Sequence, residues 1–594
     1  MTPGSPRLGQ AAPGRRRPAR RRAPAWLVSS GRLASFALPP LLGGLALAAS
    51  LPPLGLWPLG PVGVALLAWS CAGRPWRRRL AAGLLFGAGQ LGVGDAWALQ
   101  FTGAGYLALV AFEAAFFALA AAASPSGRGR VPALAGWLTL AEWARDSWPF
   151  GGAPLGGIAL GQTSGPLLQL ARLGGPLLVA GSAFLAGTAL QDLLAGAAGR
   201  LRRAGPRRSG ATGLVAFGIL ALLGLAGAAA PDGGPALSLL PVAAVQGGGP
   251  RGLSALDVPA AGVLAAELRA THDLGPGARL VVWPEDVVAL DRPLAGSPEE
   301  HLLERIASAR RATLVAGVTE PAGPGKFRNE AAVFGPSGRL IGTYEKVHPV
   351  PFGEYVPLRG LLGHLVSFAA VPLDAVFGHG TGMIATPAGR LGILISYETF
   401  FASRGRSATR AGAQLLLVPT NTASYATDQV PAQELAASRL QAVAEGRDLV
   451  QSATDGYSAV IGPSGRVLER SGLGRASDLR ALVALRSGWT LYERLGDWPV
   501  LVLAATASAS GWLVEALSAR RRRQRRLAAS TGADRPTPGA PGTPAGVPAT
   551  ASSPGTARPG AGAVSSGVGA RGPLEPSPKS TWLNSTNLPT QITP

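Results

Sequence analysis

Residues 391–398 read LGILISYE, an apolar run that ends in Ser396, Tyr397 and Glu398. A short apolar run before a turn, here Thr-Phe-Phe, is typical of a buried strand. The end of such a strand brings a side chain to the tip of a sheet, where a nucleophile on a tight turn meets its substrate. The stretch therefore predicts a sheet with Ser396 as the candidate nucleophile.

The surrounding sequence has the pattern of an α/β domain. Between residues 237 and 490, short apolar strands alternate with helix-like stretches such as 298–310 and 428–446. Turn sequences typical of hairpins recur as GPSGR at 335–339, PAGR at 387–390 and GPSGR at 462–466. This mixture predicts an α/β sandwich of about 250 residues. Two of its strand ends carry charged residues, because VVWPE ends at Glu285 and GTYEK ends at Lys346.

The composition of the whole chain indicates a membrane protein. Hydrophobic residues make up 47% and charged residues 15%, with a mean hydropathy of +0.24, which is more apolar than an ordinary soluble enzyme. Eight apolar stretches approach the length needed to cross a hydrocarbon core of roughly 30 Å. We predict spans at about 34–51, 58–73, 80–99, 104–124, 131–147, 166–198, 212–230 and 497–518. The sixth is interrupted by Arg172 and Gly174-Gly175.

Basic residues mark every second connection between these spans. Arginines are present in the N-terminal arm, at 74–79, at Arg128 and Arg130, at 200–208 and at 520–526, whereas 52–57, 100–103 and 148–165 have no Lys or Arg. Cytoplasmic loops carry such an excess of positive charge. The pattern predicts that both termini face the cytoplasm and that residues 231–495 lie on the outer face. The net charge of +22 therefore does not indicate nucleic-acid binding, since no aromatic residues are interleaved with the basic clusters.

These features divide the chain into five predicted parts. The arm and the tail are rich in Pro, Ala and Gly, a composition that cannot bury a core. The parts are a disordered basic arm (1–30), a seven-span bundle (31–232), an extracytoplasmic α/β domain (233–495), a C-terminal transmembrane helix (496–519), and a basic cluster with a disordered tail (520–594).

The strand-end residues resemble those of a known superfamily. Glu285, Lys346 and Ser396, in this chain order, are similar to the Glu-Lys-Cys triad of the nitrilase superfamily, with serine in the position of cysteine. The sole cysteine, Cys71, lies in the second predicted span, and we interpret it as a small apolar core residue.

Longer motifs narrow the resemblance to the apolipoprotein N-acyltransferase family. They are EKVHPVPFGEYVPLR at 345–359, the SYE motif, and AEWARDSWPFGGAPLG at 141–156. The resemblance extends over most of residues 34–518. It implies a polytopic α-helical membrane bundle of about eight spans with an inserted nitrilase-like αββα sandwich.

The resemblance also implies an activity and a set of residue roles. The family transfers an acyl chain from a phospholipid to the amine of an N-terminal diacylglyceryl-cysteine on an apolipoprotein. This is the last step of lipoprotein maturation, and it takes place at the bacterial cytoplasmic membrane without a cofactor. By the match, Glu285 is the general base and Lys346 faces the oxyanion. Glu354 orients Lys346 or the acceptor amine, and Tyr397 and Glu398 shape the pocket around Ser396.

Serine at position 396 leaves three outcomes open. Ser396 acts as a slower nucleophile, or Glu285 activates the acceptor amine for direct transfer, or the domain binds lipids or lipoproteins without turnover. The loop VPTNTASY at 418–425 also departs from the family's Asn-Asp-x-Trp-Phe pattern, which implies a different acyl-chain or acceptor preference.

Other classes of function fit the sequence less well. The five histidines, His348, His364 and His379 among them, lack the close spacing of metal ligands, so we expect no metal site. GILISYE lacks the G-x-S-x-G pattern of a hydrolase nucleophile elbow. A transporter is disfavoured because the spans contain few ionisable residues and no obvious repeat.

Overall fold

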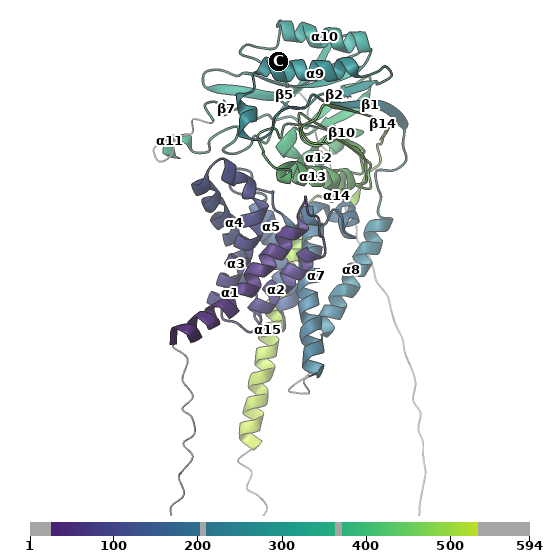
Figure 1. Cartoon of the computed structure of the whole chain (residues 1–594). Helices are drawn as coiled ribbons and strands as arrows, with labels where there is room; N and C mark the ends of the chain where they lie inside the picture. The colour runs from purple at the N-terminus through teal and green to yellow at the C-terminus, as the bar shows by residue number, and fades with distance from the viewer. Residues whose placement is uncertain (1–24, 202–209, 363–370, 533–594) are drawn as a thin grey trace, which may run out of the picture. The chain divides into compact units, whose positions relative to one another are not determined.

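A computed structural model of the chain describes residues 25–201, 210–362 and 371–532. Figure 1 shows long helices and an α/β domain in this part of the chain, and its residues up to Ala528 belong to one compact unit. Most of the predicted disordered arm and tail, and most of the arginine cluster at 200–208, lie outside the described residues.

Eight helices correspond in order to the eight predicted spans. Four helical segments of the described chain are long and apolar enough to cross a membrane, namely Gly103–Ala123, Leu168–Ala198, Ala211–Ala229 and Trp498–Ala528. The full count of eight spans stays a prediction. The helices are α1 (Ala25–Ser50), α2 (Leu59–Cys71), α3 (Trp76–Gly94), α4 (Gly103–Ala123), α5 (Arg130–Arg145), α7 (Ala171–Leu201), α8 (Ala211–Ala229) and α15 (Trp498–Gly532), with the short α6 (Ile158–Gly161) after α5.

Two predicted boundaries differ from the structure. Helix α1 begins at Ala25, inside the arm predicted as disordered, and α15 continues to Gly532, beyond the predicted end of the last span at 519. Arg, Ala and Leu dominate the extra turns of α15, and these residues have high helix propensity, so a helix can continue past the apolar stretch. The predicted interruption of the sixth span is present, since Gly174 and Gly175 have non-helical backbone angles within α7.

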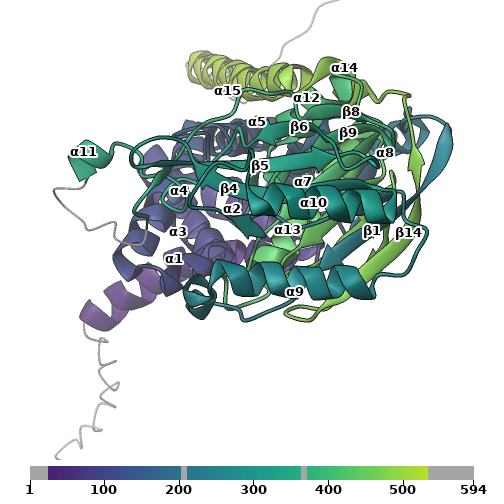
Figure 2. The ribbon, with the colours of Figure 1, turned by 90° about the horizontal axis from the view of Figure 1, so that it is seen from above.

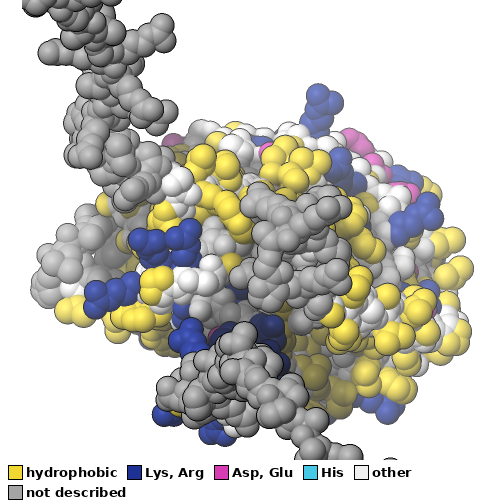
Figure 3. Space-filling view, turned by 90° about the horizontal axis from the view of Figure 1, so that it is seen from below, with side chains coloured by type: hydrophobic (Ala, Val, Ile, Leu, Met, Phe, Trp, Pro, Cys, Tyr) yellow, Lys and Arg dark blue, Asp and Glu magenta, His cyan; other side chains and the backbone are white. Residues whose placement is uncertain are grey.

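Within the described residues, the arginine-bearing turns at 74–79 and after α4 lie at one end of the helices. The indole nitrogen of Trp512 on α15 donates to the carbonyl of Ala123 at the end of α4, at 2.8 Å. Arg79, in the basic turn at 74–79, donates to the neighbouring carbonyl of Ala122 at 2.9 Å. Figure 3 views the molecule from this side, and apolar and basic side chains cover much of the described surface there.

The α/β domain contains two sheets. In the first sheet the strand order is β14-β1-β2-β4-β5-β6, with β3 beside β4 and β7 beside β5, and in the second it is β13-β12-β11-β10-β9-β8. The strands of the first sheet are β1 (Ser238–Gln246), β2 (Leu280–Val282), β3 (Val288–Ala289), β4 (Thr313–Pro321), β5 (Lys326–Phe334), β6 (Leu340–Glu345), β7 (Asp374–Ala375) and β14 (Ser477–Leu485). Those of the second are β8 (Met383–Thr386), β9 (Gly389–Ile393), β10 (Leu415–Thr420), β11 (Leu449–Ala453), β12 (Ala459–Ile461) and β13 (Val467–Arg470). The three predicted hairpin turns join the antiparallel pairs β5–β6, β8–β9 and β12–β13.

The two sheets pack face to face between two layers of helices. Side chains alternate along each strand, so Val242 of β1 faces the second sheet while Val245 faces α9 (Ala260–Asp273) and α10 (Pro298–Arg310). The second sheet is covered by α12 (Ala402–Arg410) and α13 (Gln429–Glu445). Figure 2 shows α9 and α10 lying over the first sheet. The predicted αββα sandwich is therefore confirmed.

The α13 side of the sandwich contacts the membrane helices. Gln433 of α13 donates to the carbonyl of Gly94, the last residue of α3, and accepts from the amide of Gly156 at 2.8 Å. Tyr397 donates its hydroxyl to the carbonyl of Gly152 at 3.0 Å. The sandwich thus contacts the opposite end of α3 from the basic turn at 74–79.

A buried arginine holds the loop that makes these contacts. Arg145, at the end of α5, is 1% exposed and donates to Glu113 of α4 at 2.9 Å. Its guanidinium also donates to the carbonyls of Ala153 and Leu155 and lies 3.1 Å from Asp146. One cation therefore fixes both a neighbouring helix and the loop from 149 to 157.

We expect Arg145→Met to destabilise the protein. The change leaves the carboxylate of Glu113 buried without its cation, and breaking a buried pair in this way costs roughly 3–5 kcal/mol. The midpoint of thermal unfolding in detergent should fall, with less folded protein in membranes. Arg292→Met is the matched control, because the Arg292 side chain is 48% exposed and pairs with Glu299 at the surface. Equal midpoints for the two variants would contradict the assigned role of Arg145.

Candidate active site

Glu285, Lys346 and Glu354 form one buried ion cluster. Lys346 directly follows β6 and is 1% exposed. Its Nζ lies 2.7 Å from Oε1 of Glu285 and 2.9 Å from Oε2 of Glu354. Burial alone would lower the pKa of Lys346, but the two carboxylates outweigh it and hold the pKa above its ordinary value. The ammonium is therefore charged at neutral pH and fixed in place.

Asn329 and two backbone amides hold the carboxylates of this cluster. Asn329 of β5 donates its side-chain amide to Glu285 at 2.9 Å and to Glu354 at 2.7 Å. The amide of Val350 donates to Glu354 at 2.6 Å, and the amide of Asn421 donates to Glu285 at 3.0 Å. Asn329 was not expected from the sequence, because it belongs to no motif. Its only signal is an amide side chain two residues before the apolar part of a strand.

Ser396 lies in a tight turn at the end of β9. It opens a short 3₁₀ helix, η4 (Ser396–Phe400), with a backbone φ of +47° and 9% exposure. A positive φ is uncommon for a residue other than glycine, and such strain is often found at functional sites. The structure therefore gives Ser396 the kind of turn that the sequence predicts for a nucleophile.

The hydroxyl of Ser396 has two polar neighbours that the sequence analysis missed. Its Oγ lies 3.1 Å from Oγ1 of Thr420 and 3.4 Å from Oε1 of Glu434. Thr420 in turn donates to Glu434 at 2.6 Å. Thr420 ends β10, and the amide of the next residue, Asn421, donates to Glu285. Ser396 is thus connected to the ion cluster through the end of β10 rather than by a direct hydrogen bond within the described residues.

Glu398 ties the serine turn to the lysine. It is fully buried, and its carboxylate accepts from the amides of Val347 at 2.8 Å and Ile395 at 2.8 Å. It also accepts from the hydroxyl of Tyr344 at 2.9 Å. Burial raises the pKa of Glu398 above its ordinary value, although Arg404 and these donors oppose the shift. The carboxylate therefore joins the residues just after Lys346 to the residue just before Ser396.

Tyr397 and the 421–425 loop face the membrane helices. The hydroxyl of Tyr397 donates to the loop after α5, and its ring packs against Phe401 with centroids 5.0 Å apart. Tyr425 packs edge-on against Trp97 and Phe101, with ring centroids 5.7 and 5.8 Å away. The loop that departs from the family pattern therefore lies between the ion cluster and the connection that follows α3.

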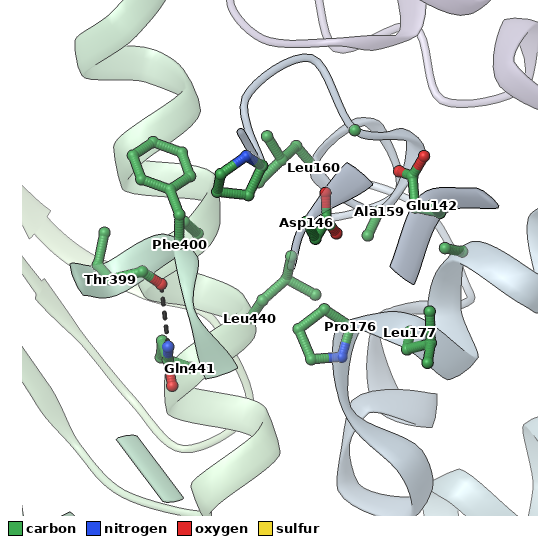
Figure 4. Close-up of a pocket in the computed structure, with 14 residues that line it drawn as sticks. Glu142, Asp146, Ala159, Leu160, Pro176, Leu177, Thr399, Phe400, Leu440 and Gln441 are labelled. Atoms are coloured by element: carbon green, nitrogen blue, oxygen red, sulfur yellow. Dashed lines mark hydrogen bonds between the residues drawn. The ribbon is translucent and has the colours of Figure 1, made fainter. Parts of the chain in front are cut away.

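A small cavity lies under η4, between the sandwich and the bundle (Figure 4). Thr399 and Leu440 line it from the sandwich, and Asp146 and Leu177 line it from the bundle. Its volume is about 40 Å³, which suits a few water molecules rather than an acyl chain. Across the described ranges, no three His, Cys, Asp or Glu side chains are grouped to hold a metal ion.

The family comparisons agree with both parts of the chain. The model of the apolipoprotein N-acyltransferase N-terminal domain matches residues 43–189, and that of the carbon-nitrogen hydrolase matches residues 242–479. An apolipoprotein N-acyltransferase of Azotobacter vinelandii is 31% identical, over 81% of this chain and 94% of the relative. One of Mycolicibacterium smegmatis is also 31% identical, over 78% of this chain and 83% of the relative.

Two solved structures of the nitrilase superfamily are each similar to less than half of this chain. Saccharomyces cerevisiae Nit3, a member of branch 10 of the nitrilase superfamily, is 20% identical, with a TM-score of 0.33 over 42% of this chain and 91% of Nit3. An amidase from Nesterenkonia sp. is 24% identical, with a TM-score of 0.30 over 44% of this chain and 95% of the amidase.

Together with the apolar helices, the two family models and the relatives define a membrane-bound acyltransferase of the carbon-nitrogen hydrolase superfamily. The chain belongs to the apolipoprotein N-acyltransferase family. The resemblance inferred from the motifs is therefore confirmed. The predicted roles of Glu285, Lys346, Ser396, Glu354, Tyr397 and Glu398, and the replacement of a catalytic cysteine by Ser396, stay predictions.

We expect Glu398→Gln to loosen the turn that carries Ser396. Val347 and Ile395 donate to different oxygens of Glu398. Glutamine keeps one acceptor oxygen, but its amide nitrogen cannot accept, so one of the two backbone amides loses its partner, and an unsatisfied buried donor costs roughly 1–3 kcal/mol. Hydrogen exchange measured by mass spectrometry should become faster in residues 345–350 and 393–400. Tyr344→Phe is the control, because it removes one side-chain donor and keeps both backbone bonds. If hydrogen exchange in these residues were unchanged in Glu398→Gln, the assigned role of Glu398 in holding the serine turn would be wrong.

Proposed function

We propose that this protein transfers an acyl chain from a phospholipid to the amine of the N-terminal diacylglyceryl-cysteine of apolipoproteins, the last step of lipoprotein maturation. The observation that carries the proposal is the combination of family membership over most of the chain with the buried Glu285–Lys346–Glu354 cluster beside the Ser396 turn. The contacts of Tyr397 and Gln433 with the membrane helices place this cluster in a domain that packs on the bundle. A phospholipid ester and a lipid-anchored acceptor both fit such a location.

The proposed reaction has two steps. Oγ of Ser396 forms a bond to the ester carbonyl carbon of the phospholipid and loses its proton to a carboxylate, for which the family resemblance points to Glu285. The Lys346 ammonium stabilises the oxyanion of the tetrahedral intermediate. The ester bond then breaks, lysophospholipid leaves with a proton, and an acyl-serine remains. In the second step the acceptor amine attacks the acyl carbon, the amide forms, and the serine hydroxyl is restored.

Glu354 and Glu398 have supporting roles in this proposal. Glu354 is the second carboxylate that pairs with Lys346, at 2.9 Å from Nζ, and helps to hold the ammonium in place. Glu398 holds the serine turn at a fixed distance from the residues that follow Lys346. Tyr397 shapes the wall toward the membrane helices. The positions of these groups are thus set before substrate binds, as electrostatic stabilisation of a transition state requires.

Serine makes the first step harder than cysteine would. A carboxylate with a pKa near 4.3 faces a thiol at about 8.5, a gap of about 6 kcal/mol, and the gap to a hydroxyl is wider still. An oxyester is also less reactive than a thioester toward the amine. A family member that binds lipoproteins without turnover is therefore the second candidate function, and Ser396 is the observation that favours it.

We further propose that the bundle lies in the bacterial cytoplasmic membrane, with the sandwich on the outer face and both termini in the cytoplasm. The arginine-bearing turns support this orientation, because they gather at the end of the bundle away from the sandwich. Cytoplasmic loops are enriched in such charges.

We expect Ser396→Ala to abolish acyl transfer. Purified full-length protein in detergent would be given phospholipid and a diacylglyceryl lipopeptide, and triacylated product would be measured by mass spectrometry. We expect product from the native chain and at least a hundredfold less from the alanine variant. The Ser396→Cys variant should be active, because a thiol is more acidic than a hydroxyl.

The other outcomes separate the alternatives. Unchanged activity in Ser396→Ala would exclude a serine nucleophile and favour direct transfer. A native chain without product, beside an active Ser396→Cys variant, would identify a homologue that does not turn over.

The orientation can be tested with one engineered cysteine. Arg475 lies on an exposed turn of the sandwich, whereas Cys71, the single native cysteine, is fully buried. We expect Arg475→Cys to react with a membrane-impermeant maleimide in intact spheroplasts, with the native chain as the unlabelled control. Reaction only after the membrane is opened would reverse the proposed orientation.

A further inference from the structure

One buried carboxylate next to the serine takes no part in the roles given above. Glu434 lies on α13, is 2% exposed, and has its Oε1 3.4 Å from Oγ of Ser396. None of its hydrogen bonds within the described residues runs to Lys346, Glu285 or Glu354. Burying a charged carboxylate costs free energy unless an opposite charge pairs with it. Glu434 therefore needs an explanation that the ion cluster does not supply.

We propose that Glu434 is the catalytic carboxylate that accepts the proton of Ser396 and returns it to the leaving group. The inference rests on the acyl transfer proposed above and gives its proton transfer to Glu434 in place of Glu285, the residue to which the family resemblance points. As Oγ bonds to the ester carbonyl carbon, its proton passes to Glu434 and the carbonyl electrons move to the oxyanion that faces Lys346. When the ester C–O bond breaks, the same proton passes from Glu434 to the oxygen of the departing lysophospholipid. In the second step the proton of the amine returns to Oγ by the reverse route.

The geometry offers two routes for this proton. One runs directly across the 3.4 Å between Ser396 and Glu434. The other runs through Thr420, whose Oγ1 lies 3.1 Å from Oγ of Ser396 and 2.6 Å from Oε1 of Glu434. A threonine hydroxyl has one proton and two lone pairs. With its proton in the shorter bond to Glu434, Thr420 can accept from Ser396, so both hydroxyl protons shift one place toward the carboxylate.

Glu285 is less well placed to receive this proton. Its Oε1 already accepts from Lys346 and Asn329, and its Oε2 accepts from the amide of Asn421. These three bonds take most of the acceptor capacity of a carboxylate. In the described chain the hydroxyl of Ser396 is hydrogen-bonded to Thr420 and Glu434 rather than to Glu285. Glu285 instead fixes the charge of Lys346.

The surroundings of Glu434 make it a stronger base than an ordinary glutamate. Burial raises the pKa of Glu434 to about 7, with Glu285 adding to the shift and with Thr420, Lys346 and Ser396 opposing it. Tyr425 is a further titratable group close to it. The contacts of the neighbouring Gln433 with the membrane helices are neutral. An ordinary glutamate has a pKa near 4.3, so Glu434 is better matched to a hydroxyl.

The decisive experiment compares Glu434→Gln in the native chain and in the Ser396→Cys variant. Full-length protein in detergent would be given a fluorescent phospholipid, and release of lysophospholipid in a single turnover would report the first step. A lost general base costs a factor of 10² to 10⁴, so we expect at least a hundredfold loss with serine. With cysteine we expect less than a tenfold loss, because the thiol ionises more readily. If Glu434 had only a structural role, Glu434→Gln would slow the native chain and the Ser396→Cys variant equally. That result would overturn the proposal.

Control variants separate this inference from the proposed function. Glu445→Gln is matched, since Glu445 is a buried glutamate of the same helix that accepts from Thr409 at 2.7 Å; we expect activity within threefold of the native chain. If Ser396→Ala is inactive while Glu434→Gln retains full activity, the inference fails and the proposed function stands. If Ser396→Ala retains full activity, the serine nucleophile itself fails.

Two further measurements distinguish a loss of proton transfer from a folding defect. Thr420→Val removes the relay and keeps the volume, and we expect about a tenfold loss with serine and almost none with cysteine. In the native chain the single-turnover rate should fall as the pH drops below about 7, because protonated Glu434 cannot accept a proton. A native rate that stays constant from pH 8 to pH 5, or equal losses in both backgrounds for Thr420→Val, would contradict the assignment.

Discussion

The site depends on one buried ammonium. Lys346 is almost fully removed from solvent, and a charge in that position is stable only when opposite charges and hydrogen bonds surround it. Glu285 arrives from the turn after β2, Glu354 from the loop after β6, and Asn329 from β5. These segments meet at one edge of the first sheet. The strand order β2-β4-β5-β6 is therefore a condition for the cluster, and the cluster in turn fixes the ends of those strands.

The second sheet supplies the hydroxyl half of the site. Thr420 ends β10, and Ser396 lies three residues after the end of β9. Because these two strands are adjacent and parallel, the two side chains meet at the same edge. Glu398 then connects the two sheets, because its single carboxylate accepts from Val347 on one side and Ile395 on the other. The separation of ammonium and hydroxyl is thus set by buried backbone hydrogen bonds. Neither half has to be ordered by substrate, which lowers the entropic cost of the reaction.

The sequence predicted the parts of this site that lie at strand ends within motifs. Glu285, Lys346 and Glu354 are of this kind, and the hairpin turns and the sandwich followed from local patterns. Asn329 was not predictable, because strand pairing brings it to the cluster. The amide of Lys346, the residue after β6, donates to the carbonyl of Asn329 at 2.9 Å. Glu434 was missed for a different reason. Helix α13 is buried on nearly every side, so no amphipathic pattern distinguishes a catalytic position from a packed one.

The loop from 149 to 157 connects the bundle with both sides of the proposed proton transfer. Arg145 holds the loop from 149 to 157 by its backbone carbonyls, and that loop accepts from Tyr397, the neighbour of Ser396. The same loop donates to Gln433, the neighbour of Glu434. Both partners of the proposed proton transfer are therefore adjacent in sequence to an anchor on the membrane helices.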